Sequence, residues 1–128
     1  AIGSQYAAKV YGMKILAKNI GDFKNNFTRF LVLSKKDSEQ PTGKDKTSLT
    51  FSLKDKPGAL FRFLKPFADR NINLTKIESR PSKVKPWEYV FFMEIEEHRK
   101  NKRCKEALKY AKKLCEHLKV LGSYPKET

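Results

Sequence analysis

Residues 47–68 read TSLTFSLKDKPGALFRFLKPFA, and the spacing of their apolar side chains changes halfway along. Apolar and polar residues alternate over 48–53, which predicts a strand with one buried face. A helix should follow, because Asp55 can cap it and Pro57 suits its first turn. Pro66 should kink or shorten that helix, because it has no N–H to donate. The predicted inward stripe consists of Leu60, Leu64, Phe67 and Ala68.

The same two kinds of pattern recur further along the chain. Strands are predicted over 72–79, 87–96 and 120–124. Pro81 and Pro86 bracket the turn between the first two of these strands. A second helix is predicted from the helical spacing of Cys104, Ala107, Leu108, Ala111, Leu114, Cys115 and Leu118. The order β-α-β-β-α-β predicts the ferredoxin-like α+β fold, an antiparallel four-stranded sheet with two helices on one face.

The residues before this stretch divide into two parts. Ile2, Tyr6 and Val10 recur every four residues up to Gly12, which predicts a helix with a glycine just past its end. Short strands are predicted over 13–20 and 27–33. Residues 34–46, SKKDSEQPTGKDK, have no apolar side chain and include a proline and a glycine, which indicates a linker. We therefore expect an N-terminal part over 1–33, a linker over 34–46 and one domain over 47–128.

Length and charge limit the possible functions. The chain has 128 residues and a net charge of +14, which raises nucleic acid as a partner. The basic residues are scattered from Lys9 to Lys126, however, which favours a solvated lysine-rich surface. No apolar stretch approaches the ~20 residues needed to span a bilayer, so we expect a cytoplasmic protein. Ala1 lies within a helix-like run, so we expect a fragment of a longer protein.

The cysteines and histidines do not form a metal-binding pattern. Cys104 and Cys115 lie eleven residues apart without a CxxC motif, and both fit the apolar face of a helix. We expect buried, reduced thiols rather than a disulfide or a zinc site. His98 and His117 are isolated in the sequence and are predicted to lie at the surface.

Three segments carry a resemblance to a known family. TSLTFSL at 47–53, PGALF at 57–61 and INLTKIESRPSK at 72–83 closely resemble the ACT domains that sense phenylalanine in prephenate dehydratase and in aromatic amino acid hydroxylases. Upstream, NNFTRFLVL at 25–33 resembles the TRF segment near the end of the prephenate dehydratase catalytic domain. The closing LGSYP at 121–125 is similar too. We therefore interpret residues 1–33 as a helix-and-strand remnant of that α/β catalytic domain.

The resemblance implies a lyase reaction in the parent protein. Prephenate dehydratase converts prephenate to phenylpyruvate, carbon dioxide and water without a metal or organic cofactor. Thr28 matches the essential threonine of the family, whose hydroxyl can donate a hydrogen bond to the leaving oxygen. Arg29 would hold a carboxylate or support the local fold. The present chain alone should be inactive.

The resemblance also implies an allosteric site for L-phenylalanine. The candidate residues are Gly58, Ala59, Leu60, Asn73, Leu74, Glu78, Ser79 and Arg80. Residues 58–60 would offer backbone N–H groups at a helix start, where a carboxylate can bind, and apolar surface. Residues 73–74 would add an acceptor and a pocket wall, whereas the charged residues of 78–80 could instead pair with each other. Sites of this family lie where two ACT domains meet, which implies a homodimer that could pair into a tetramer.

Two alternatives share the predicted fold. A basic RNA-recognition module has the same element order and stacking aromatics on its third strand, where this chain has Tyr89, Phe91 and Phe92. The segment lacks the glycine and the basic opening of that module's motif, so we do not expect nucleic acid as a partner. The regulatory domain of an aromatic amino acid hydroxylase would not explain the TRF segment.

Overall fold

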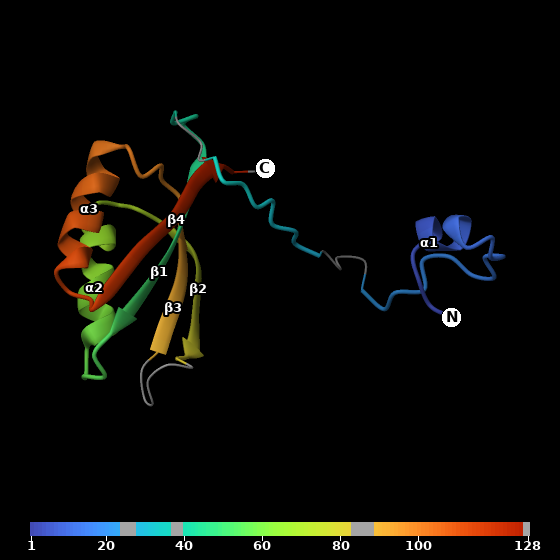
Figure 1. The fold of residues 1–128 in the computed structure, drawn as a ribbon, viewed down its shortest axis with the longest axis horizontal. Coiled ribbons are helices and arrows are strands. Elements are labelled where there is room, and N and C mark those ends of the chain that lie inside the picture. The colour runs from blue at the N-terminus through green and yellow to red at the C-terminus, as the bar shows by residue number, and fades with distance from the viewer. Residues whose placement is uncertain (24–27, 37–39, 83–88, 127–128) are drawn as a thin grey trace. The chain divides into compact units, whose positions relative to one another are not determined.

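The structure is a computed structural model that describes residues 1–23, 28–36, 40–82 and 89–126 (Figure 1). The chain divides into two compact units, residues 1–33 and residues 34–128.

The second unit is built on one antiparallel sheet with the strand order β2-β3-β1-β4. Its strands are β1 (Asp45–Leu53), β2 (Leu74–Pro81), β3 (Tyr89–Ile95) and β4 (His117–Pro125). The helices α2 (Ala59–Ala68) and α3 (Lys102–Lys112) lie together on one face of the sheet (Figure 1). The predicted ferredoxin-like fold is confirmed.

The core lies between that sheet face and the two helices. The Phe51 ring of β1 stacks on Phe63 of α2, with 3.7 Å between ring centroids, and on Phe91 of β3 at 4.9 Å. Phe63 is fully buried, although it was not in the predicted stripe, whereas Ala68 is exposed. The stripe centres on Phe63, which stacks on Phe51, and on Phe67, whose ring centroid lies 5.9 Å from that of Phe63.

Helix α2 begins differently from the prediction. Its N-cap is Gly58, with φ +75°, and not Asp55. The chain makes an extra turn first, in which the Ala59 N–H donates to the Lys56 carbonyl at 3.1 Å. Pro66 lies inside the helix, which ends two residues later at Ala68, in agreement with the expected shortening.

Several element boundaries are set by strand pairing. Helix α3 ends at Lys112, so the predicted helical spacing through Leu118 is wrong beyond that point. Strand β4 begins at His117 because it pairs with β1 down to Ser52. Strand β1 itself begins at Asp45 rather than at residue 47. The predicted start of the third strand at Trp87 lies outside the described residues.

The described residues of the first unit contain one short helix, α1 (Gln5–Val10). The Ser4 hydroxyl caps it by accepting from the Ala7 N–H at 3.0 Å, and Gly12 follows its end with φ +61°, as predicted. The strands predicted over 13–20 and 27–33 are wrong, because the described residues of 1–33 contain no strand. A strand needs a neighbour to pair its backbone groups. Phe27 lies outside the described residues.

Candidate functional site

The glycine of the GALF segment adopts a conformation that other residues rarely adopt. Gly58 has φ +75°, and a Cβ at this position would lie 2.9 Å from Nη1 of Arg62. Ala59 and Leu60 follow in the first turn of α2, where they are partly buried and pack against the core. The start of α2 therefore presents backbone N–H groups beside apolar surface, which suits a carboxylate attached to an apolar group.

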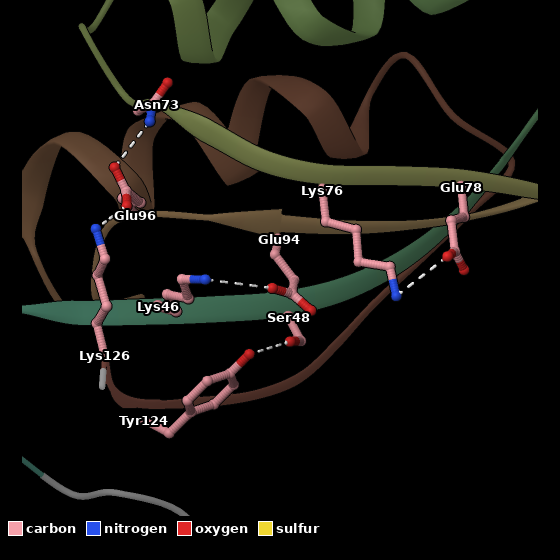
Figure 2. A network of polar contacts seen from close by, with 9 residues as sticks. All are labelled: Lys46, Ser48, Asn73, Lys76, Glu78, Glu94, Glu96, Tyr124 and Lys126. Atoms are coloured by element: carbon pink, nitrogen blue, oxygen red, sulfur yellow. Dashed lines mark hydrogen bonds and ion pairs between the residues drawn. The ribbon is translucent and has the colours of Figure 1, made fainter. Parts of the chain in front are cut away.

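The predicted residues of the ESRP segment lie on an edge strand. Glu78, Ser79 and Arg80 are exposed on β2, which has β3 as its only neighbour in the sheet of the described residues. Glu78 forms an ion pair with Lys76, with 3.2 Å between Oε1 and Nζ (Figure 2). It does not pair with Arg80, which was one alternative from the sequence.

Strand register places these two segments at the same end of the sheet. Arg80 pairs with Val90 of β3, and Val90 pairs with Ser52 near the end of β1. The chain then turns into the loop before Gly58, so β1 and β2 both end at the end of the domain at which α2 begins (Figure 1).

Asn73 and Leu74 lie at the opposite end of the domain. They follow the C-terminus of α2, whose 10 residues separate them from Gly58. A helix of that length spans about 15 Å. One chain therefore brings residues 58–60 and 78–80 to one end and holds residues 73–74 at the other.

The Asn73 side chain is held by a polar network (Figure 2). Its Nδ2 donates to Oε2 of Glu96 at 2.8 Å, and Nζ of Lys126 pairs with the same carboxylate. The hydrogen bonds from Asn73 and Lys126 lower the pKa of Glu96. The amide nitrogen is thus engaged, and the Asn73 Oδ1 is oriented away from this acceptor.

The open face of the sheet is polar. Lys46 pairs with Glu94, with 3.7 Å between Nζ and Oε2, and the Ser48 hydroxyl lies 2.8 Å from the Tyr124 hydroxyl (Figure 2). Side chains alternate along β3, so Phe91 lies on the helix-covered side together with its stacking partner Phe51.

The same alternation bears on the RNA-recognition alternative. Tyr89 shares the helix-covered side with Phe91, so Phe92 is the only one of the three aromatics on the open face. An RNA-recognition sheet stacks two or three bases on aromatics of its open face. Tyr124 also lies on the open face, where its hydroxyl contacts Ser48, but the third strand contributes Phe92 alone of its three aromatics and so lacks the cluster typical of such a module.

The two predicted catalytic residues lie in the first unit. Thr28 and Arg29 are both exposed and belong to no helix or strand. Their part in catalysis stays a prediction.

His98 is buried, so its predicted surface position is wrong. Its Nδ1 accepts from the Lys100 N–H at 3.1 Å. Nearby, the Thr47 hydroxyl donates to the Glu97 carbonyl at 2.5 Å and lies 2.8 Å from the Ser123 hydroxyl. These contacts join positions up to 76 residues apart, so the sequence carried no signal for them.

Asp45 also belongs to the buried polar groups. Burial raises the pKa of its carboxyl, but hydrogen bonds from Thr42 and Gly43 outweigh this effect, so the pKa lies below the ordinary value of 3.8. The Thr42 N–H donates to Oδ2 at 2.8 Å, and the Thr42 hydroxyl donates to Oδ1 at 2.8 Å. This carboxylate closes the loop that leads into β1.

Both cysteines are free thiols, and they differ in exposure. Cys104 is fully buried, and burial, with Glu97 nearby, raises its pKa to about 12. Cys115 lies beyond the end of α3 and is partly exposed, so only one of the two is fully buried as predicted. Burial also raises the pKa of Cys115.

Two kinds of feature are absent from the described residues. No group of three or more histidine, cysteine or acidic side chains gathers there in a way that could hold a metal ion. Among the same residues, no helix is both long enough and apolar enough to cross a membrane.

Comparison with known proteins finds two families. The ACT domain family matches residues 47–112, and the prephenate dehydratase family matches residues 1–38. The bifunctional chorismate mutase/prephenate dehydratase of Aquifex aeolicus is 56% identical over 126 residues, covering 98% of this chain and 34% of that protein. The prephenate dehydratase of Methanocaldococcus jannaschii is 46% identical over 127 residues, covering 98% of this chain and 46% of that protein.

A solved structure agrees with these relatives. The crystal structure of the prephenate dehydratase of Arthrobacter aurescens in complex with L-Phe is 36% identical, with a TM-score of 0.64, and covers 68% of this chain and 29% of that one. The chain thus spans 34% and 46% of the length of the two sequence relatives. These similarities favour the prephenate dehydratase interpretation over the hydroxylase and RNA-recognition alternatives.

Proposed function

Because this chain belongs to the ACT domain family and aligns over nearly its whole length with prephenate dehydratases, we propose that it is the C-terminal part of such an enzyme. Its ACT domain binds L-phenylalanine as an allosteric effector. The observation that carries this proposal is the exposed start of α2, where Gly58 has φ +75°, in a domain similar to that of an enzyme crystallised with L-Phe.

The proposed site lies between two chains. Phenylalanine cannot reach from Gly58 to Asn73 within one domain, because α2 separates them by about 15 Å. Strand β2 is an edge strand, so two copies can pair antiparallel about a two-fold axis. That pairing brings residues 73–74 of one chain to the end of the other chain where residues 58–60 and 78–80 lie.

Each part of the ligand then has a partner of suitable chemistry. The first-turn N–H groups of α2 after Ala59, whose own N–H donates to the Lys56 carbonyl, receive the carboxylate. The amide nitrogen of Asn73 donates to Glu96, and the Oδ1 of the same side chain accepts from the ammonium group. Leu60 and Leu74, both packed at the edge of the core, supply apolar walls for the ring.

The whole enzyme would convert prephenate to phenylpyruvate, carbon dioxide and water in the cytoplasm, without a cofactor. Thr28 would donate a hydrogen bond to the departing hydroxyl, and Arg29 would hold a substrate carboxylate. Both lie in a unit whose apolar side chains are widely exposed, for example Leu16 at 91% and Val32 at 96%. Such exposure supports a place within a larger catalytic domain, and this chain alone should show no turnover.

Calorimetric titration with L-phenylalanine and sedimentation with and without it test the site. We expect Asn73→Ala and Gly58→Ala each to weaken binding, and we expect phenylalanine to favour the dimer by mass action. A mixture of the two variants in equal amounts should regain roughly a quarter of the wild-type sites, because each mixed dimer has one intact site.

The mixture distinguishes the two-chain site from its alternative. If both residues served the same chain, every site in the mixture would carry one defect and no binding would return. Binding by a protein that sediments as a monomer at all concentrations would also exclude the two-chain site.

A further inference from the structure

A cavity of about 300 Å³ lies between the two connections β1–α2 and α3–β4. Its polar lining consists of Lys54, Lys56, Arg62, Lys113, Glu116 and the thiol of Cys115. Residues 54–62 and residues 113–116 are far apart in the sequence, and the fold brings them together around this cavity. Its volume is at the lower end of small-molecule sites.

The charge around this cavity is strongly positive. Four cations and one carboxylate give a formal charge of +3 (4 − 1). Within the described residues, none of the five forms an ion pair. Several positive charges around one cavity make its electrostatic potential more positive, which attracts anions.

Arg62 is oriented for such a role. Its Nη2 donates to the Pro57 carbonyl at 3.2 Å, which holds the guanidinium over the loop that forms the cavity wall. A guanidinium has five N–H donors, so the remaining ones can form paired hydrogen bonds with a phosphate. Lys113, the C-cap residue of α3, lines the opposite wall, and its Nζ lies 5.9 Å from the centre of the Tyr110 ring.

We propose that this cavity binds a small polyphosphate anion, such as pyrophosphate or the phosphate groups of a nucleotide. Three lysines and one arginine, with a net formal charge of +3 once Glu116 is counted, match a multiply charged phosphate compound better than a single carboxylate. The cavity shares Ala59 with the proposed amino acid site, and its Arg62 guanidinium lies beside Gly58, but its other lining residues come from the β1–α2 loop and the segment after α3, and none comes from β2. The inference does not rest on phenylalanine binding.

Cys115 provides a direct measurement on the 128-residue chain. It lines the cavity and is partly exposed, whereas Cys104 is fully buried, so N-ethylmaleimide should label Cys115 alone. Pyrophosphate should slow this labelling roughly tenfold at ten times its Kd, because only the free fraction reacts. We expect half-protection below about 1 mM in a buffer of about 0.15 M salt. Cys115→Ser gives the background rate.

Charge-neutral variants identify the residues that hold the anion. Arg62→Gln and Lys113→Gln should each raise the half-protection concentration about tenfold, since each removes hydrogen bonds to a charged group. Lys109→Gln is the matched control, because it makes the same charge change on the exposed surface of α3 outside the cavity. It should change half-protection by less than about twofold.

Four results would overturn the proposal. These are no protection by pyrophosphate or ATP, an equal loss in the Lys109 variant, stronger protection by single-stranded RNA than by pyrophosphate, and protection by L-phenylalanine in competition with pyrophosphate. The last would make the cavity part of the amino acid site. Protection by pyrophosphate in a protein that does not bind phenylalanine would support this proposal and contradict only the preceding one.

Discussion

Gly58 combines a backbone requirement with a steric one. Its φ of +75° is costly for any residue with a Cβ, and a Cβ would also meet the Arg62 guanidinium at 2.9 Å. Gly43 has a similar φ of +88°, but nothing lies within 4 Å of the corresponding position. Alanine at Gly43 would therefore measure the cost of the backbone conformation alone. Alanine at Gly58 would add the effect of a side chain that fills the space at the start of α2.

Gly58→Ala should lower the free energy of unfolding by about 1 kcal/mol, and Gly43→Ala should lower it by a similar amount. Only the Gly58 variant should also weaken L-phenylalanine binding, by at least roughly tenfold. Urea unfolding and calorimetric titration measure the two effects. Equal phenylalanine affinity in both variants would remove Gly58 from the proposed site.

Asp45 should make stability depend on pH. Its pKa is lowered in the folded state, so its stabilising contribution is complete above the ordinary value of 3.8 and is lost as the pH falls through the lower folded value. Asp45→Asn should therefore be less stable than the wild type at pH 7, and this difference should shrink below about pH 3.8.

Guanidinium chloride unfolding from pH 7 down to pH 3 tests this expectation. Asp55→Asn, at an exposed position in the β1–α2 loop, is the control and should follow the wild type. A constant difference between the wild type and Asp45→Asn over the whole range would contradict the assigned role of the carboxylate.

At the scale of elements, small side chains set the approach of α3 to the sheet. Cys104, Ala107 and Ala111 are all fully buried on one face of this helix. Larger residues here would push the helix away from the rest of the buried core, to which all three belong. The interior is close-packed, so it offers no space for such a change.

Ala107→Leu should destabilise the domain by about 1–3 kcal/mol through overpacking. Ala68→Leu makes the same change at an exposed position of α2 and should be nearly neutral, because alanine and leucine have similar helix propensities. Thermal unfolding measured by circular dichroism compares the two. Equal melting temperatures would show that α3 can shift at little cost.

At the scale of the whole molecule, the two units differ in how well they cover their apolar side chains. The second unit has a buried core, whereas residues 30–33 of the first unit are between 68% and 96% exposed. The border between them lies before Thr42 and Gly43, whose hydrogen bonds to Asp45 belong to the second unit.

A chain of residues 34–128 should therefore unfold with a free energy within about 0.5 kcal/mol of the full chain. It should bind less of a hydrophobic dye, because the exposed apolar residues are gone. A chain of residues 46–128 is the control and should be less stable, because it lacks Asp45 and its loop. A marked loss of stability already in the 34–128 chain would show that the first unit supports the second.

The local pattern of the sequence was sufficient for the order of the elements in the second unit. Period-two alternation around Phe51 and helical spacing around Ala107 are properties of neighbouring residues, and they survive in the folded chain. The GALF and ESRP segments were likewise recognisable, because each is a continuous motif. The strands predicted for residues 13–20 and 27–33 failed because local pattern cannot supply a partner strand.

Contacts between residues far apart in the sequence decided the element boundaries, the burial of Phe63 and the polar clusters. A local sequence pattern does not predict such contacts. Pairing of β4 with β1 ended α3 at Lys112, and packing against the Phe51 ring buried Phe63. The polar cluster around His98 and the basic cavity each join segments that lie dozens of residues apart. Local pattern was thus enough to predict most strands, helices and motifs of the second unit, whereas which segments meet follows from long-range pairing and packing across the whole fold.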